Sequence, residues 1–120
     1  MKDFKNIDLN DSSLMSFSFD GSDLKIRVYI WNEIVVQISF LGMINFIFNE
    51  SDFFKELVVV PKSPFLDRAL SYRYAKTPSE PAMIFPQEHP YHHFRLLDIN
   101  DNAAFEVIAE DILVEVVEQR

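Results

Sequence analysis

Alternating apolar and polar positions are the clearest pattern in the first half of the chain. The stretch 23–31, DLKIRVYIW, has an apolar residue at every second position, and 33–40, EIVVQISF, repeats the pattern. Side chains two residues apart share one face of a β-strand, so each stretch predicts a strand with one face turned to a core. Together they predict an antiparallel hairpin. The inward positions are Leu24, Ile26, Val28, Ile30, Ile34, Val36, Ile38 and Phe40.

Shorter runs of the same period predict further strands on both sides of this hairpin. They are 14–19 and 43–48 early in the chain, and 91–99, 103–111 and 112–119 late in it. Turn sequences such as DGSD and NDN separate neighbouring runs. We therefore expect a mostly antiparallel sheet of about six strands, with meander hairpins at both ends.

The centre of the chain lacks this alternation and predicts one or two short helices. Ser63 is a good N-cap and Pro64 suits the first helical position, so we expect a helix within 62–76. A strand through 70–75 is the alternative for the end of that segment. Ser51 predicts the cap of another short helix, because an acidic residue follows it in the first turn.

Two segments are expected to be irregular. Residues 77–90 carry four prolines, which favour extended or turn geometry and predict a loop. Residues 1–11 are mostly polar and predict a loose N-terminal arm or a short edge segment. No repeat or linker divides the chain, so residues 1–120 are expected to form a single domain of the α+β or mainly-β class.

Composition and charge narrow the classes of function. The 120 residues are 48% hydrophobic and 14% aromatic, which is enough for a packed core. The net charge of −8 disfavours nucleic acid and anionic membranes as partners, because like charges repel, and it favours a basic protein. The absence of cysteine excludes disulfides and thiolate chemistry. Without a signal-like or spanning apolar run, the chain is expected to be soluble and cytoplasmic.

All three histidines lie in the heptapeptide EHPYHHF, which raises the question of a metal or catalytic site. His89 and His93 have the spacing of a helical zinc pair, but Pro90 favours an extended chain on which the rings do not converge. Alternation instead predicts a strand with His92 at the margin of the core, and with His93 and Arg95 on the solvated face. No nucleophile motif or glycine-rich loop occurs. We therefore assign no catalytic, cofactor-binding or metal-ligating residue and expect a protein that is not an enzyme.

Charged residues are unevenly distributed along the chain. Residues 98–120 hold seven acids and one arginine, a local net charge of −6, which predicts either a solvated face or an acidic docking surface. Residues 62–76 hold four basic residues and two tyrosines, which predicts contact with a protein, or with the acidic strands within the chain or in a homodimer. The candidate partner-binding residues are Tyr29, Trp31, Tyr72, Arg73, Tyr74, His93, Arg95, Glu106, Glu110 and Glu115.

A small set of residues carries a resemblance to known proteins. It comprises Trp31, Phe40, Gly42, Phe94, Glu106, Val107 and Ala109. A strand ending in an aromatic residue, a φ-x-F-x-G turn and a late strand of the E-V-x-A type resemble uncharacterised small bacterial β-rich proteins and the immunity proteins of polymorphic toxins. The resemblance touches about half of the chain and concerns fold residues. It implies a protein that binds a cognate toxin, often over the toxin's active site.

Three functions follow as hypotheses. The first is a non-enzymatic cytoplasmic protein-binding module, of the immunity type, that inhibits a basic toxin. The second is a small-molecule-binding or enzymatic β domain with a pocket near the His89–His93 loop, using Glu88, His92 and Arg95 as well. The third is a self-assembling structural protein whose terminal strand, 112–119, pairs with its copy across a two-fold axis. The glutamates of that strand would oppose such pairing.

Overall fold

The computed structural model describes residues 6–30, 34–51, 53–77, 79–80, 82, 86 and 88–119. Within them, eight strands form one antiparallel sheet and one helix packs at its end. The elements are β1 (Ile7–Phe19), β2 (Leu24–Ile30), β3 (Ile34–Leu41), β4 (Asn45–Phe48), β5 (Phe53–Val60), α1 (Pro64–Arg73), β6 (His92–Asp98), β7 (Ala103–Ala109) and β8 (Asp111–Gln119). The expected antiparallel sheet is confirmed, but the expected number of about six strands is too low. The expected meander is present in β1-β2-β3, and it is wrong for the C-terminal end, because β8 pairs with β3 instead of β7.

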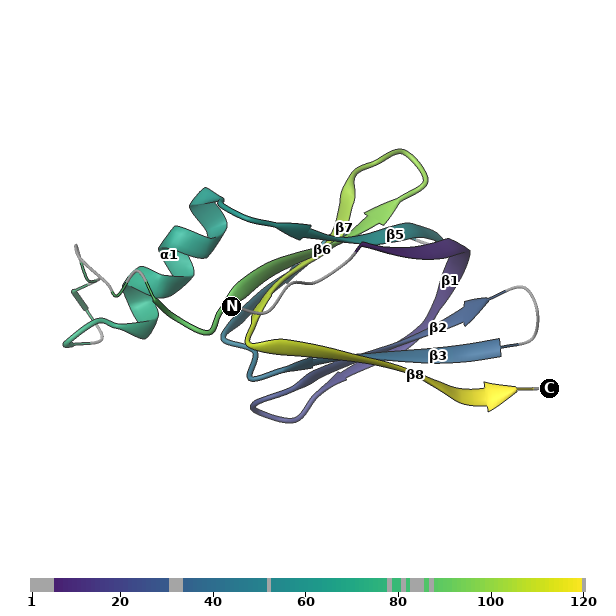
Figure 1. Cartoon of the computed structure of the whole chain (residues 1–120), viewed down its shortest axis with the longest axis horizontal. Helices are drawn as coiled ribbons and strands as arrows, with labels where there is room; N and C mark the ends of the chain where they lie inside the picture. Colours follow the sequence, from purple (N-terminus) through teal and green to yellow (C-terminus); the bar gives the residue numbers. More distant parts are fainter. Residues whose placement is uncertain are drawn as a thin grey trace.

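The sheet is folded over into two layers that enclose the core (Figure 1). Its strand order is β4-β7-β6-β5-β1-β2-β3-β8. The long strand β1 belongs to both layers, because its first half pairs with β5 and its second half pairs with β2. Irregular register within β1 accompanies this change of partner. The layers β4-β7-β6-β5 and β2-β3-β8 therefore face each other across one interior.

Of the two expectations for residues 1–11, the loose arm is wrong for residues 7–11, which begin a strand half that pairs with β5 alone, in agreement with the alternative of an edge segment. Residues 7–11 are the beginning of β1, and Leu9 is buried in the core. This segment reads as polar because it contains aspartates and an asparagine, but its backbone pairs with β5 and its apolar residues face inward. Residues 1–5 lie outside the described residues.

The alternation that predicted the central hairpin also gives the core. Leu24, Ile26 and Val28 of β2 lie opposite Phe40, Ile38 and Val36 of β3, and all six are buried. Phenylalanines from the other layer complete the interior, and the rings of Phe40 and Phe94 meet between the layers at 5.7 Å. Burial of such side chains, at about 25 cal/mol per Å², is the main contribution to the stability of the fold.

The helix expected after Ser51 is wrong, because β5 occupies residues 53–60. The sequence FFKELVVV allows either structure locally, although three consecutive valines favour a strand. In the fold, β5 lies between β1 and β6, which satisfy its backbone hydrogen-bonding groups on both sides. Phe54 and Leu57 are buried by the same placement.

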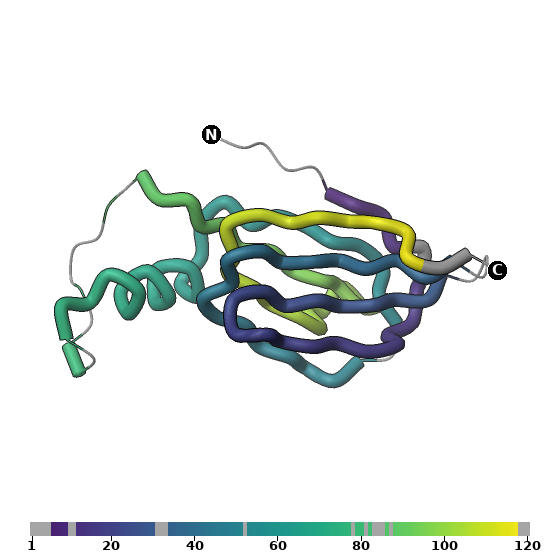
Figure 2. The backbone as a smooth tube through the Cα atoms, turned by 90° about the horizontal axis from the view of Figure 1, so that it is seen from below, coloured from purple at the N-terminus to yellow at the C-terminus, as the bar shows by residue number. Residues whose placement is uncertain are grey.

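The helix expected within 62–76 is confirmed as α1, and the alternative strand through 70–75 is wrong. Ser63 caps it by accepting the Leu66 N–H through Oγ at 3.0 Å, and Pro64 begins the helix. The helix packs Leu66 and Leu70 against Tyr91 and Ile108, in a second, smaller apolar cluster. It projects from one end of the two-layered body (Figure 2).

The described part of 77–90 is a loop, as expected, with only an isolated bridge between Thr77 and Glu80. Among the described residues, no helix has both the length and the apolar character needed to cross a membrane.

The two layers are also joined where β3 continues into β4 and β7 continues into β8. Gly42 turns the first of these crossings with a φ of +62°, and its N–H donates to Asp23 Oδ1 at 3.1 Å. The second crossing runs alongside it, since the Glu110 N–H donates to the Leu41 carbonyl at 2.9 Å. The Glu110 side chain lies over Gly42, in the space that a Cβ there would need.

We predict that Gly42→Ala lowers the free energy of unfolding by about 1–2 kcal/mol, because it combines a strained φ with displacement of the Glu110 side chain. Gly21→Ala is the matched control, since Gly21 also has a positive φ, +101°, but has open space around it. Urea denaturation measures both. Adding Glu110→Ala should recover part of the stability lost in Gly42→Ala, and should recover none of the stability lost in Gly21→Ala. If Gly42→Ala shows no recovery, backbone strain accounts for its whole effect.

Candidate protein-binding surface

The terminal strand β8 forms one edge of the sheet, with apolar side chains exposed on both of its faces. It pairs with β3 on one side, and in the described part of the chain no strand pairs with its other side. Val114 and Val116 lie opposite the core residues Ile38 and Val36, yet Val116 is 59% exposed. Leu113, on the outer face, is 49% exposed. We call residues Asp111–Gln119 the β8 edge.

Acidic side chains accompany the apolar ones on this strand. Glu115 is exposed on the outer face, where Gln37 of β3 is its neighbour. Arg27 of β2 lies one strand further in, and its Nε–H donates to Gln37 Oε1 at 3.0 Å rather than to Glu115. No cation in the described residues forms an ion pair with the Glu115 carboxylate. Glu110, directly before the strand, is also exposed.

A second apolar surface lies between β1 and β4, which we call the aromatic seam (Phe17, Phe19, Phe46 and Phe48). The ring pairs Phe17–Phe48 and Phe19–Phe46 are 5.2 and 6.2 Å apart. These rings face inward, since Phe17 lies opposite buried Ile26, but Phe19 is 53% exposed. The seam is the incompletely covered border of the core, and contacts to buried Phe105 anchor it.

The two aromatic candidates at the end of β2 differ in what the structure says of them. Tyr29 is half-buried on the outer face, in register with Val35. Burial of these aromatics beneath the central helix was the alternative, and for Tyr29 it is wrong, because α1 packs at the opposite end of the sheet (Figure 1). Trp31 lies outside the described residues.

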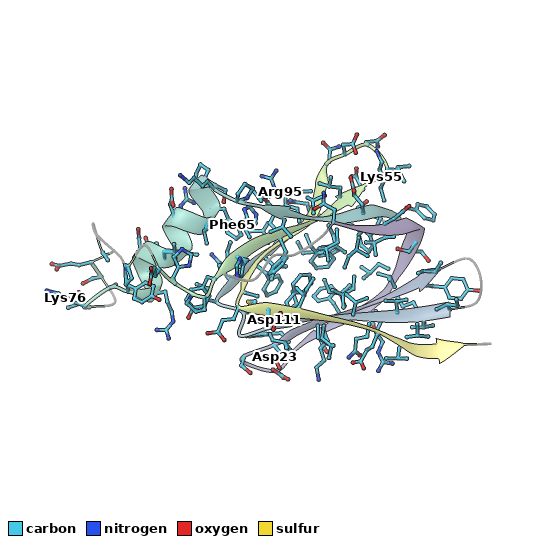
Figure 3. All side chains as sticks on the ribbon, viewed as in Figure 1. Asp23, Lys55, Phe65, Lys76, Arg95 and Asp111 are labelled. Carbon is cyan, nitrogen blue, oxygen red and sulfur yellow. The ribbon has the colours of Figure 1, made fainter. Side chains whose placement is uncertain are left out.

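The basic candidates on α1 lie outside the β8 edge. Tyr72 and Arg73 are exposed, and Tyr74 is half-buried against the apolar cluster under α1. Arg73 donates to the Tyr91 hydroxyl at 2.9 Å, and this hydrogen bond, with the nearby carboxylate of Glu110, raises the pKa of Arg73. Lys76, in the same basic segment, lies at the far tip of the molecule from the end of β8 (Figure 3). The structure therefore brings Arg73 near Glu110, just before β8, whereas Lys76 lies far from the end of that strand.

Three further candidates form a polar network under α1. His93 was expected on the solvated face, but it has no exposed surface, because the first turn of α1 covers this part of β6. Its Nδ1 is 2.7 Å from Ser63 Oγ, and its Nε2 is 3.1 Å from Glu106 Oε1. Arg95 donates to the same Glu106 oxygen at 2.8 Å. The ring of Phe65 meets the imidazole edge to face, with the ring centroids 5.3 Å apart.

Neutral His93 satisfies every member of this network. The Ser63 oxygen accepts the Leu66 N–H, so its own hydrogen is free to donate to Nδ1. The Nε2–H then donates to Glu106. Burial lowers the pKa of His93, as does the positive charge of Arg95, while Glu106 opposes the shift. The imidazole is therefore neutral near pH 7.

The network is a structural clamp rather than a catalytic centre. Serine, histidine and glutamate also form the triads of hydrolases. Here, however, the imidazole has no surface on which to protonate a leaving group, and the Ser63 hydroxyl is engaged as a helix cap. His93 joins the start of α1 to the sheet through Ser63 and Phe65, while Glu106 on β7 is bound to both His93 and Arg95 on β6.

The second hypothesis placed a pocket beside the histidine loop, and a cavity of about 540 Å³ does lie there. Its polar lining includes Lys62, His89 and His92, while Val59, Pro61 and Leu70 are among its apolar residues. His93 and Arg95 face away from it, on the other side of β6. The four-residue constellation proposed for a ligand is thus split between two faces. In the described residues, no group of three acidic or histidine side chains could hold a metal ion.

Three exposed apolar residues of the β8 edge are absent from the candidate residues that the sequence indicates. Leu113, Val114 and Val116 were assigned to a strand, and the two valines to its inward face. Their exposure follows from their place at the edge of the sheet, which alternation does not reveal. The run of apolar residues on both faces of ILVEVV was the available signal, since an edge strand with one covered face needs only every second residue apolar.

Comparisons of this chain with protein-family models, with curated proteins and with solved structures find no match.

We predict that the protein loses stability as the pH falls below about 6.5, the value for His93 in the unfolded chain. The folded-state pKa is lowered, so the unfolded state binds more protons and the stabilisation present above pH 6.5 is lost toward the lower folded value. Urea denaturation between pH 5 and 8 measures the free energy of unfolding, which should fall by about 1 kcal/mol or more over this range.

A matched variant separates this histidine from the others. His89→Gln changes a histidine outside the network, so its free energy of unfolding should depend on pH as that of the wild type does. His93→Gln should be destabilised at pH 7.5, and its free energy of unfolding should change less with pH below pH 6.5. A His93→Gln profile as steep as the wild type would place the pH dependence elsewhere.

Proposed function

We propose that the protein is a non-enzymatic protein-binding module that uses the β8 edge to bind a basic protein, in the manner of an immunity protein that inhibits a basic toxin. The observation that carries the proposal is the β8 edge itself, which combines exposed Leu113, Val114 and Val116 with the carboxylate of Glu115, and exposed Glu110 directly precedes it. Exposed apolar patches with a polar rim are typical of protein interaction sites.

Electrostatics favours a basic partner for this surface. The chain carries a net charge of −8, and its last 23 residues carry −6 of it. Such a field accelerates encounter with a positively charged protein and opposes the approach of a second identical chain. The third hypothesis, self-assembly through the terminal strand, is less favoured for that reason.

The absence of an assembled reaction centre in the described residues also supports binding over catalysis. His93 joins the start of α1 to the sheet, Glu106 is bound to His93 and Arg95, and His92 faces the opposite side of the strand. The cavity beside His89 lacks the convergent groups that the second hypothesis required. Immunity-type binding needs no such centre, because an inhibitor acts by covering the surface of its target.

We predict that a basic protein from native lysate co-purifies with the chain, and that Glu115→Lys weakens its binding by about three- to tenfold, mainly through slower association. Glu88→Lys is the matched control: it makes the same change in net charge at an exposed site in the loop preceding β6, outside the β8 edge. Binding of the purified partner is measured by surface plasmon resonance at two salt concentrations.

The proposed function makes a second demand on that partner. A toxin should lose its activity when the wild-type chain is added, and recover part of it when the Glu115→Lys chain replaces the wild type at the same concentration, chosen near the wild-type dissociation constant. Failure to retain any basic protein, or equal losses for Glu115→Lys and Glu88→Lys, would contradict binding through the β8 edge.

A further inference from the structure

We propose that the β8 edge binds its partner by strand addition, receiving an extended basic segment that pairs with β8 and continues the sheet. This inference rests on the proposed function, because it specifies how the same surface engages its basic partner. It adds the geometry of the contact and the sequence pattern of the segment that fits.

The β8 edge is the most suitable acceptor among the sheet edges of the described residues. Strand β4 ends the sheet on the other side, but it is only four residues long. Each half of β1 also has an unpaired side, because the first half pairs with β5 alone and the second half with β2 alone, but the register is irregular in both halves. The open side of the second half also faces the aromatic seam and β4. Strand β8 is nine residues long. Short edges discourage pairing, whereas a long one offers a row of free backbone groups.

The backbone of β8 is regular where an added strand would pair. Its register with β3 runs without interruption from Asp111, opposite Leu41, to Val116, opposite Val36. A bulge then follows, because Val35 pairs with Glu118. In a regular antiparallel strand, every second residue directs its N–H and C=O away from the existing partner. The Ile112 N–H already donates to Asp111 Oδ1 at 2.8 Å, so the donors and acceptors of a strand-addition site are those of residues 113–116.

Side chains on both faces specify the incoming segment. On the inner face, Val114 and Val116 need aliphatic neighbours to complete their burial, since the opposite layer leaves them exposed. On the outer face, Glu115 has neutral Gln37 on one side and an open position on the other. Opposite charges on directly facing strand positions are favourable. The segment that fits therefore alternates aliphatic residues with lysine or arginine.

The same pattern disfavours a second copy of β8 as the occupant. A two-fold axis at Val114 places Leu113 opposite Glu115 of the other chain, and the reverse, so that neither carboxylate meets a cation. An axis at Glu115 places the two carboxylates face to face. With −8 on each chain, repulsion adds to both arrangements. A basic hetero-partner avoids these costs.

A tethered strand tests the proposal in the full chain. A flexible glycine-serine linker after Arg120 carries a short tail of alternating lysine and valine, which the linker holds at an effective concentration on the order of millimolar. One control tail alternates glutamate and valine, and another has a proline at the centre of the lysine–valine tail. Amide hydrogen exchange of residues 113–116 is measured for each, at a protein concentration where size-exclusion chromatography shows a monomer.

The lysine–valine tail should slow exchange of the outward-facing amides of 113–116 by at least about tenfold, and the two control tails should not. Glu115→Lys should remove the protection given by the lysine tail, and should create it for the glutamate tail. This exchange of charges tests the contact itself, because both partners of the pair change sign.

Several results would overturn the proposal. Equal protection by the lysine and glutamate tails would show that only apolar contacts hold the tail, without a contribution from Glu115. Protection at β1 or β4 would show that another edge accepts the added strand. Protection that appears only in a dimer would identify a second copy as the occupant. If the partner from lysate binds in a Glu115-dependent way without protecting residues 113–116, the proposed function stands and strand addition fails.

Discussion

The fold depends on one strand that serves two layers. The first half of β1 pairs with β5 and its second half pairs with β2, so a single backbone joins both layers into one sheet. The crossings at Gly42 and Glu110 join the layers a second time, at the other end of the body. Between these connections, the inward faces of both layers bury a common phenylalanine-rich core. The aromatic seam and the β8 edge are exposed because the two layers do not cover the core along these borders.

The position of α1 depends on a polar clamp as well as on apolar packing. Ser63 is at once the cap of α1 and the hydrogen-bonding partner of His93, so the start of the helix and the surface of β6 are fixed by the same hydroxyl. Glu106 and Arg95 extend the network across β6 and β7. Buried polar groups are costly when unpaired, and this network leaves none of its own members without a partner.

The open borders of the sheet explain why a protein-binding role is favoured. The aromatic seam is closed in part by contacts among its own rings and with Phe105, whereas the β8 edge keeps aliphatic side chains and backbone groups exposed together. Glutamates on such an edge oppose indiscriminate pairing, and at the same time select a basic partner. Protection from self-association and selectivity for a partner thus have the same physical origin here.

The local sequence is sufficient to predict the hairpin β2–β3, its inward residues and the capped start of α1, because period-two alternation and N-caps are local properties. The strand at 53–60 depends on long-range pairing, since its backbone partners come from β1 and β6. Long-range packing also buries His93 under a helix that is close to it in space and not in sequence, and it leaves valines of an inward face exposed at an edge. Burial depends on which elements meet, and alternation within one strand does not contain that information.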